Sequence, residues 1–325
     1  MKKSAIILIL FAFAVSGSLA QTIVANGTVS NQGVPLHYAF VYDKQSKSAT
    51  YTDSLGEFKL PVNQGAQLTI NCKGYAESTI RVTDNNAVNV ILKKDLTPTA
   101  QGTANADEKI VEDAFKPTHD EVGRPGINSF GATTFQTIKE TRGSQFFFNQ
   151  WAHGYIVNAL GDIVQTPSLL LNYNKMTGDL YMTEDQASVM VGYKNHIRAF
   201  VLFGPQDQQY TFEMMSGIST DLFCQVISAG SKYKLYKLIT TKFIPSNYHT
   251  DGVFTTGNLY DEYADQGSYF ISDLTTTAFQ ALNLNKKSIK LVFAAEGTKV
   301  DDFLATHKVK ADDAFVKALG DAMNQ

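Results

Sequence analysis

The chain has 325 residues, of which 44% are hydrophobic and 11% aromatic, proportions that are typical of packed cores and exclude a disordered protein. Its 28 basic and 31 acidic residues give a net charge of −3, which argues against nucleic-acid binding, and the presence of only two cysteines excludes a disulfide framework. The length is sufficient for two ordinary domains.

Residues 1–20 form a predicted secretory signal peptide. Lys2 and Lys3 precede an apolar run over residues 5–15, and the small residue Ala20 suits signal peptidase, which places the cut before Gln21. The alternative, a retained anchor helix, requires a longer apolar core of roughly 20 residues. We therefore expect an exported protein with no transmembrane segment after cleavage.

Residues 21–94 are predicted to form a seven-stranded β-sandwich. Short segments of alternating hydrophobicity are separated by turns rich in Asn, Asp and Gly, which tolerate left-handed backbone at low steric cost. The expected strands lie at residues 22–29, 38–42, 49–52, 58–60, 68–72, 79–82 and 87–92.

Four strings stand out in this part: Gly-Thr-Val at 27–29, Gly-Val-Pro-Leu at 33–36, Thr-Asp-Ser-Leu-Gly-Glu-Phe at 52–58, and Lys-Gly-Tyr at 73–75. They resemble the carboxypeptidase regulatory-like domain, a transthyretin-like sandwich. The resemblance implies an accessory module, found on peptidases, sugar-binding proteins and outer-membrane nutrient importers, without an active site. We expect Asp53 to cap the turn before Gly56 rather than to act as a ligand or base.

Residues 95–141 are predicted to be a linker. The periodicity fades there, and the composition shifts towards Thr, Ala, Asn, Gly and Pro. One short helix is expected at residues 106–115, and Pro117 would end it.

Residues 142–325 are predicted to form a larger antiparallel sheet closed by C-terminal helices. Short alternating runs are joined by turns such as those at 161–162, 177–179 and 230–231, which are too short for crossover helices. After residue 285 the apolar residues follow helical spacing, which predicts three short helices on one side of the sheet.

The alternation slips around Tyr236, which predicts a bulge or a bend that would let the sheet curl. A curled sheet could enclose an apolar ligand, and ordinary core packing explains the same aromatic residues equally well. The residues in question are Phe146, Phe147, Phe148, Trp151, Phe200 and Phe203.

Both cysteines are predicted to be packed thiols. Cys72 continues the alternation of Leu68 and Ile70 on the buried face of a strand, and Cys224 lies in an apolar string. An interdomain disulfide is the alternative in an oxidising compartment, and sequence spacing does not decide between them.

A second resemblance rests on the string Asn-Tyr-His-Thr-Asp-Gly at 247–252, with Gly-Asn at 257–258, Asp-Glu-Tyr at 261–263, and Tyr269. This part is similar to an uncharacterised family of exported proteins from Gram-negative envelopes. The resemblance implies a common architecture and export to the periplasm or cell surface of a Gram-negative bacterium, and it implies no reaction.

The sequence contains no nucleophile elbow, no paired zinc ligands and no phosphate-binding glycine loop, so we predict no catalytic residues, metal or cofactor. The best remaining polar cluster is a set of five candidate binding residues among tyrosines: His249, Asp251, Asp261, Glu262 and Asp265. Several carboxylates near aromatic rings could bind a cation or a glycan. They lack the spacing of a calcium loop. The alternative is a solvent-exposed acidic loop without a ligand.

These observations favour a non-enzymatic envelope protein that binds an envelope protein, a glycan or an apolar ligand. One alternative is a hydrolase of cell-surface glycans or peptides, with Asp261 or Glu262 as acid and base; it requires two carboxyl groups about 5–10 Å apart. Another is a purely structural envelope component.

Overall fold

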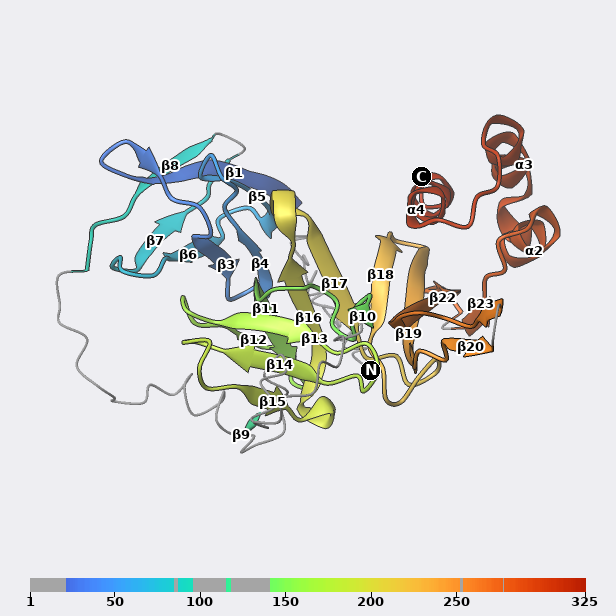
Figure 1. Ribbon diagram of the computed structural model, residues 1–325. Helices are drawn as coiled ribbons and strands as arrows, with labels where there is room; N and C mark the ends of the chain where they lie inside the picture. The colour runs from blue at the N-terminus through green and yellow to red at the C-terminus, as the bar shows by residue number, and fades with distance from the viewer. Residues whose placement is uncertain (1–21, 85–86, 96–114, 118–140, 252–253, 277) are drawn as a thin grey trace, which may run out of the picture. The chain divides into compact units, whose positions relative to one another are not determined.

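The computed structural model describes residues 22–84, 87–95, 115–117, 141–251, 254–276 and 278–325 (Figure 1). The predicted signal peptide and the predicted linker helix lie outside the described residues, apart from Phe115. The fold is mainly β, as predicted, and the chain divides into two compact units. The first unit ends at Lys93 and the second at Gln325, and the short segment Cys72–Tyr75 groups with the second.

The first unit consists of two four-stranded sheets, β2-β1-β5 with β8 beside β1, and β4-β3-β6-β7. All neighbouring strands are antiparallel except β1 and β8. The strands are β1 (Thr22–Asn31), β2 (Val34–Pro35), β3 (Phe40–Asp43), β4 (Ser48–Tyr51), β5 (Glu57–Asn63), β6 (Gln67–Asn71), β7 (Ser78–Arg81) and β8 (Val88–Ile91). The seven predicted strands are confirmed, and β2 is an additional strand of two residues.

Alternating burial along these strands builds the core of the first unit, as in β1, where Ile23, Ala25 and Val29 are buried. Asp53 caps the turn between β4 and β5, as predicted. Its Oδ1 accepts hydrogen bonds from the backbone N–H groups of Leu55 (2.9 Å) and Glu57 (2.8 Å).

The second unit contains a thirteen-stranded sheet whose main path is β10-β22-β19-β18-β17-β16-β11-β13-β14-β15-β9. Its neighbours are antiparallel except for the two-residue pairing of β10 with β22, which confirms the predicted antiparallel sheet. The strands are β9 (Phe115–Pro117), β10 (Thr141–Arg142), β11 (Ala152–Asn158), β12 (Ile163–Val164), β13 (Leu170–Tyr173), β14 (Leu180–Thr183), β15 (Met190–Gly192), β16 (Ile197–Phe203), β17 (Gln209–Glu213), β18 (Cys224–Ala229), β19 (Tyr233–Ile244), β22 (Asp261–Asp273) and β23 (Ala278–Ala281).

The predicted bulge exists, but it lies in β18 rather than at Tyr236 in β19. The register shifts between Val226 and Ser228, whereas β19 runs without interruption. The sequence pattern slips in β19 because Leu235 and Tyr236, on opposite faces, are both buried.

A cluster of buried side chains from β11 to β18 forms one core of the second unit. Phe200 and Phe212 stack with ring centroids 4.8 Å apart, and Tyr173 contacts both rings. Phe147 and Phe148 pack against this cluster, so these aromatic residues take part in core packing. Phe203 is buried on the opposite face of β16.

Three helices, as predicted, follow the sheet: α2 (Lys286–Val292), α3 (Gly297–Thr306) and α4 (Asp313–Met323). Short 3₁₀ turns lie at η1 (Lys194–His196), η2 (Pro205–Asp207) and η3 (Ala294–Glu296). The helices build a second core against Leu235 and Ile271, and α4 packs on β18 and β19. Among the described residues, no helix combines the length and apolar character that crossing a bilayer requires.

Both cysteines are free thiols in different environments. Cys224 is fully buried in β18, as predicted, and burial together with the Glu213 charge raises the pKa of its thiol to about 12. Cys72 follows the end of β6 and is only half-buried, so its predicted place on the buried face of a strand is wrong.

We expect one thiol of the folded protein to react with Ellman's reagent at pH 8 and the other to react only after denaturation. The reactive thiol is Cys72, and burial raises its pKa, so it should react more slowly than free cysteine. Cys72→Ser should leave the folded protein unreactive. Equal reaction rates of both thiols in the folded protein would contradict this assignment.

Candidate functional site

The candidate site lies at one end of a long hairpin formed by β19 and β22, which pair from Tyr233 opposite Asp273 to Ile244 opposite Glu262. The loop between them carries a smaller hairpin of β20 (His249–Asp251) and β21 (Phe254–Thr256). We call residues 243–263 the hairpin end. All five predicted binding residues lie in or next to it.

Polar residues of the loop hold the hairpin end in shape. The N–H of Ser246 donates to Asp261 Oδ1 at 2.6 Å, and the N–H of Asn258 donates to Asn247 Oδ1 at the same distance. Gly257 has φ +91°, and a Cβ there would lie 2.4 Å from the carbonyl oxygen of Asn247. Several residues of the recognisable string therefore have structural roles.

Aromatic contacts support the base of the hairpin end. The guanidinium of Arg142 lies 3.7 Å from the ring centroid of Tyr260, within range for a cation–π interaction. The rings of Phe243 and Tyr263 face each other across β19 and β22 at 5.1 Å.

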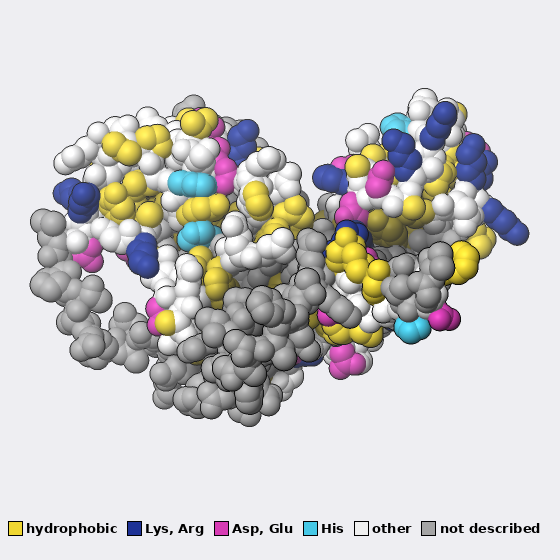
Figure 2. Space-filling view, viewed as in Figure 1, with side chains coloured by type: hydrophobic (Ala, Val, Ile, Leu, Met, Phe, Trp, Pro, Cys, Tyr) yellow, Lys and Arg dark blue, Asp and Glu magenta, His cyan; other side chains and the backbone are white. Residues whose placement is uncertain are grey.

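The hairpin end exposes large hydrophobic side chains. Single exposed apolar residues are ordinary, but several on one short segment mark an interaction surface or an aggregation hazard. The exposed fractions are 44% for Phe243, 38% for Ile244, 44% for Tyr248, 77% for Phe254 and 47% for Leu259. Figure 2 shows hydrophobic and acidic side chains near one another in the region of β20 and β23.

The five predicted residues do not converge on one point. Asp261 and Asp265 lie on one face of β22 and Glu262 on the other, because side chains alternate along a strand. Four residues of strand separate the two aspartates by about 13 Å. His249 and Asp251 belong to β20. Within the part of the chain that the structure describes, no group of three or more His, Cys, Asp and Glu residues is placed to hold a metal ion.

Asp265 instead takes part in a contact between distant segments. Lys175 Nζ lies 2.6 Å from Asp265 Oδ2, and the Thr241 hydroxyl donates to Oδ1 at 2.6 Å. The Lys175 side chain is only 8% exposed, whereas that of Asp265 is 48% exposed. Lys175 was not among the predicted residues, because a lysine in a hairpin turn is usually solvated.

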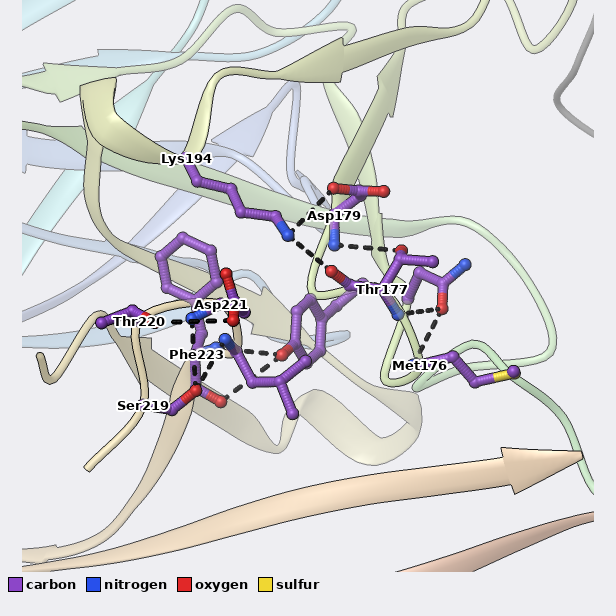
Figure 3. A network of polar contacts seen from close by, with 11 residues as sticks. Met176, Thr177, Asp179, Lys194, Ser219, Thr220, Asp221 and Phe223 are labelled. Atoms are coloured by element: carbon purple, nitrogen blue, oxygen red, sulfur yellow. Dashed lines mark hydrogen bonds and ion pairs between the residues drawn. The ribbon is translucent and has the colours of Figure 1, made fainter.

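Figure 3 shows the polar network around the turn that carries Lys175. Asn174 Oδ1 accepts hydrogen bonds from the N–H groups of Met176 (2.9 Å) and Thr177 (3.2 Å). Lys194 donates to the carbonyl of Thr177 and forms an ion pair with Asp179 at 3.3 Å. Asn174 within the turn and Lys194 outside it therefore both stabilise the turn.

The neighbouring loop before β18 lies against the same turn. The Phe223 N–H donates to the hydroxyl of fully buried Tyr173 at 3.0 Å, and Ser219 Oγ accepts from the N–H of Leu222 at 3.0 Å (Figure 3). A Cβ at Gly178 would lie 2.0 Å from the carbonyl oxygen of Asp221, so only glycine allows this close approach.

A second cluster of ionisable side chains crosses β17, β18 and β19. Glu213 pairs with Lys234 at 2.6 Å and accepts a hydrogen bond from the Tyr236 hydroxyl at 3.0 Å. Burial, and then the charge of Glu213, raises the pKa of Tyr236 and of Cys224. The phenol and the thiol therefore stay protonated near neutral pH, and the cluster ties strands together rather than supplying a nucleophile.

The comparisons bear on the first unit. No curated protein matches the sequence. Residues 25–102 match the family model of the CarboxypepD_reg-like domain, which confirms the predicted resemblance for about the first quarter of the chain.

Proposed function

We propose that this chain is an exported, non-enzymatic envelope protein with a binding or assembly role, and that the hairpin end is its contact surface for another protein. The observation that carries the proposal is the exposure of Phe243, Ile244, Tyr248, Phe254 and Leu259 on one short segment. Burying such side chains against a partner is favourable at roughly 25 cal/mol per Å² of apolar area.

The arrangement of the carboxylates supports binding over hydrolysis. A glycosidase needs two carboxyl groups about 5–10 Å apart in one cleft, whereas the backbones of Asp261 and Asp265 lie about 13 Å apart along β22 and Glu262 lies on the other face of the strand. Both also have structural partners, because Asp261 caps the Ser246 backbone and Asp265 pairs with Lys175.

The chemistry of the exposed residues favours a protein over a glycan. Sugars stack on flat aromatic rings and require polar side chains around them. Ile244 and Leu259 are aliphatic and offer neither a ring face nor a hydrogen bond. Protein partners bury aromatic and aliphatic anchors together, with polar groups at the rim.

The test is photo-cross-linking of the exported protein in its native cell, with benzoyl-phenylalanine in place of Phe254. We expect a reproducible cross-link to one envelope protein, and Phe254→Ser with Leu259→Ser should weaken that complex at least about tenfold, since central anchors dominate interface energy. Affinity of the purified pair can be measured by calorimetry.

Leu160 provides the matched control, since it is 81% exposed on a turn of the same unit. A cross-linker at position 160 should not capture the partner, and Leu160→Ser should leave the affinity unchanged. An absence of specific capture at position 254, or full affinity in the double variant, would count against the proposal.

A further inference from the structure

We propose that the outer surface of α2 and the end of α3 binds the surface of an anionic phospholipid membrane. This site is separate from the hairpin end and does not depend on the function proposed for it. Charge, a pocket and one exposed leucine carry the inference.

The local charge has the opposite sign to that of the chain. Residues 283–310 contain six lysines and three acidic residues, while the whole chain carries a net charge of −3. Figure 2 shows Lys and Arg side chains gathered over the region of α2 and α3. Clusters of four or more basic residues attract anionic lipid headgroups.

These lysines differ in whether they have an ion-pair partner. Lys290 forms an ion pair with Asp301 at 2.6 Å, and Lys299 lies 3.7 Å from Glu296. The others are exposed and have no ion-pair partner among the residues that the structure describes; they are Lys286, Lys287, Lys308 and Lys310. We call these four lysines the basic face.

A pocket of about 610 Å³ lies within the basic face, between the start of α2 and the end of α3. Lys286 and Lys308 line it together with the apolar side chains of Leu284, Leu304 and Val309. Its lining therefore combines positive charge with apolar side chains. This combination suits a phosphate headgroup that is attached to an acyl chain.

Leu291 gives the basic face an apolar contact. It is 75% exposed and follows Lys287 by one helical turn, so both side chains lie on the same side of α2. A lysine and a leucine on one side of a helix suit the membrane interface, where the ammonium group reaches the headgroups and the leucine enters the acyl boundary. The basic face contains no arginine, the residue that nucleic-acid sites favour.

The experiment is binding of residues 21–325 to vesicles, measured by flotation and by titration. We expect binding to vesicles that contain phosphatidylglycerol, no binding to phosphatidylcholine alone, and a decrease with rising salt. Lys286→Gln, Lys287→Gln and Lys308→Gln together should weaken binding on the order of a hundredfold, at roughly fivefold for each lysine. Leu291→Ser should weaken it further.

The control carries the same change in net charge on the first unit, through Lys44→Gln, Lys59→Gln and Lys93→Gln, and should bind like the wild type. Circular dichroism should show that both triple variants fold. The proposal would be overturned by equal binding to neutral vesicles, by equal losses in the two variants, or by binding to single-stranded DNA or heparin without binding to phosphatidylglycerol.

Discussion

Asp265→Asn is expected to lower the free energy of unfolding of the second unit by about 2–3 kcal/mol. The substitution leaves the Lys175 ammonium without its counter-charge at a position where its side chain is only 8% exposed. Removing one partner of a fully buried ion pair costs roughly 3–5 kcal/mol. The loss expected here is smaller because the carboxylate of Asp265 is half-exposed. Urea unfolding followed by circular dichroism measures the effect.

The double variant Lys175→Met with Asp265→Asn is the control. Methionine fills a similar volume without a charge, so the double variant should regain most of the stability that Asp265→Asn loses. If Asp265→Asn has the stability of the wild type, the buried lysine has found another partner or water, and the proposed structural role of Asp265 is wrong.

The contacts of two predicted binding residues, Asp265 and Asp261, change their interpretation. Asp265 pairs with a lysine ninety positions away in sequence, and Asp261 caps a backbone N–H in its own loop. The fold therefore explains why an aspartate stands at each of these two positions. The exposed apolar residues of the hairpin end, rather than Asp261 and Asp265, remain available to a partner.

Local pattern was sufficient to predict most of the elements. Alternation and turn residues located the seven longer strands of the first unit, because strands such as β1 and β5 bury alternate side chains. The same reasoning placed the bulge in the wrong strand, since β19 buries side chains on both faces around Leu235 and Tyr236 and its alternation is lost.

The candidate site was less predictable because its main contacts are long-range. A sequence shows that residues 247–263 are rich in acidic and aromatic residues, but not that Asp265 meets Lys175 or that Arg142 covers Tyr260. The exposure of Phe254 and Leu259 was also hidden, since apolar residues in a run of short strands are usually buried.

The turn that carries Lys175 depends on Gly178. Gly178→Ala should destabilise the second unit by about 3 kcal/mol. Gly178 has φ +76°, which strains any other residue, and the new Cβ would meet the Asp221 carbonyl oxygen at 2.0 Å. The turn must then move away from the loop before β18, and Lys175 would lose its alignment with Asp265. Calorimetry that resolves the two units measures the loss.

Gly33→Ala separates the two causes of that loss. Gly33 has φ +82°, but apart from its chain neighbours no atom of the described residues lies within 4 Å of its would-be Cβ, so the substitution should cost the first unit only about 1 kcal/mol of backbone strain. The excess loss in Gly178→Ala then measures the close contact between the turn and Asp221. Equal losses in the two variants would mean that the loop before β18 moves aside at little energetic cost. The turn would then not need its contact with Asp221 to hold Lys175 against β22.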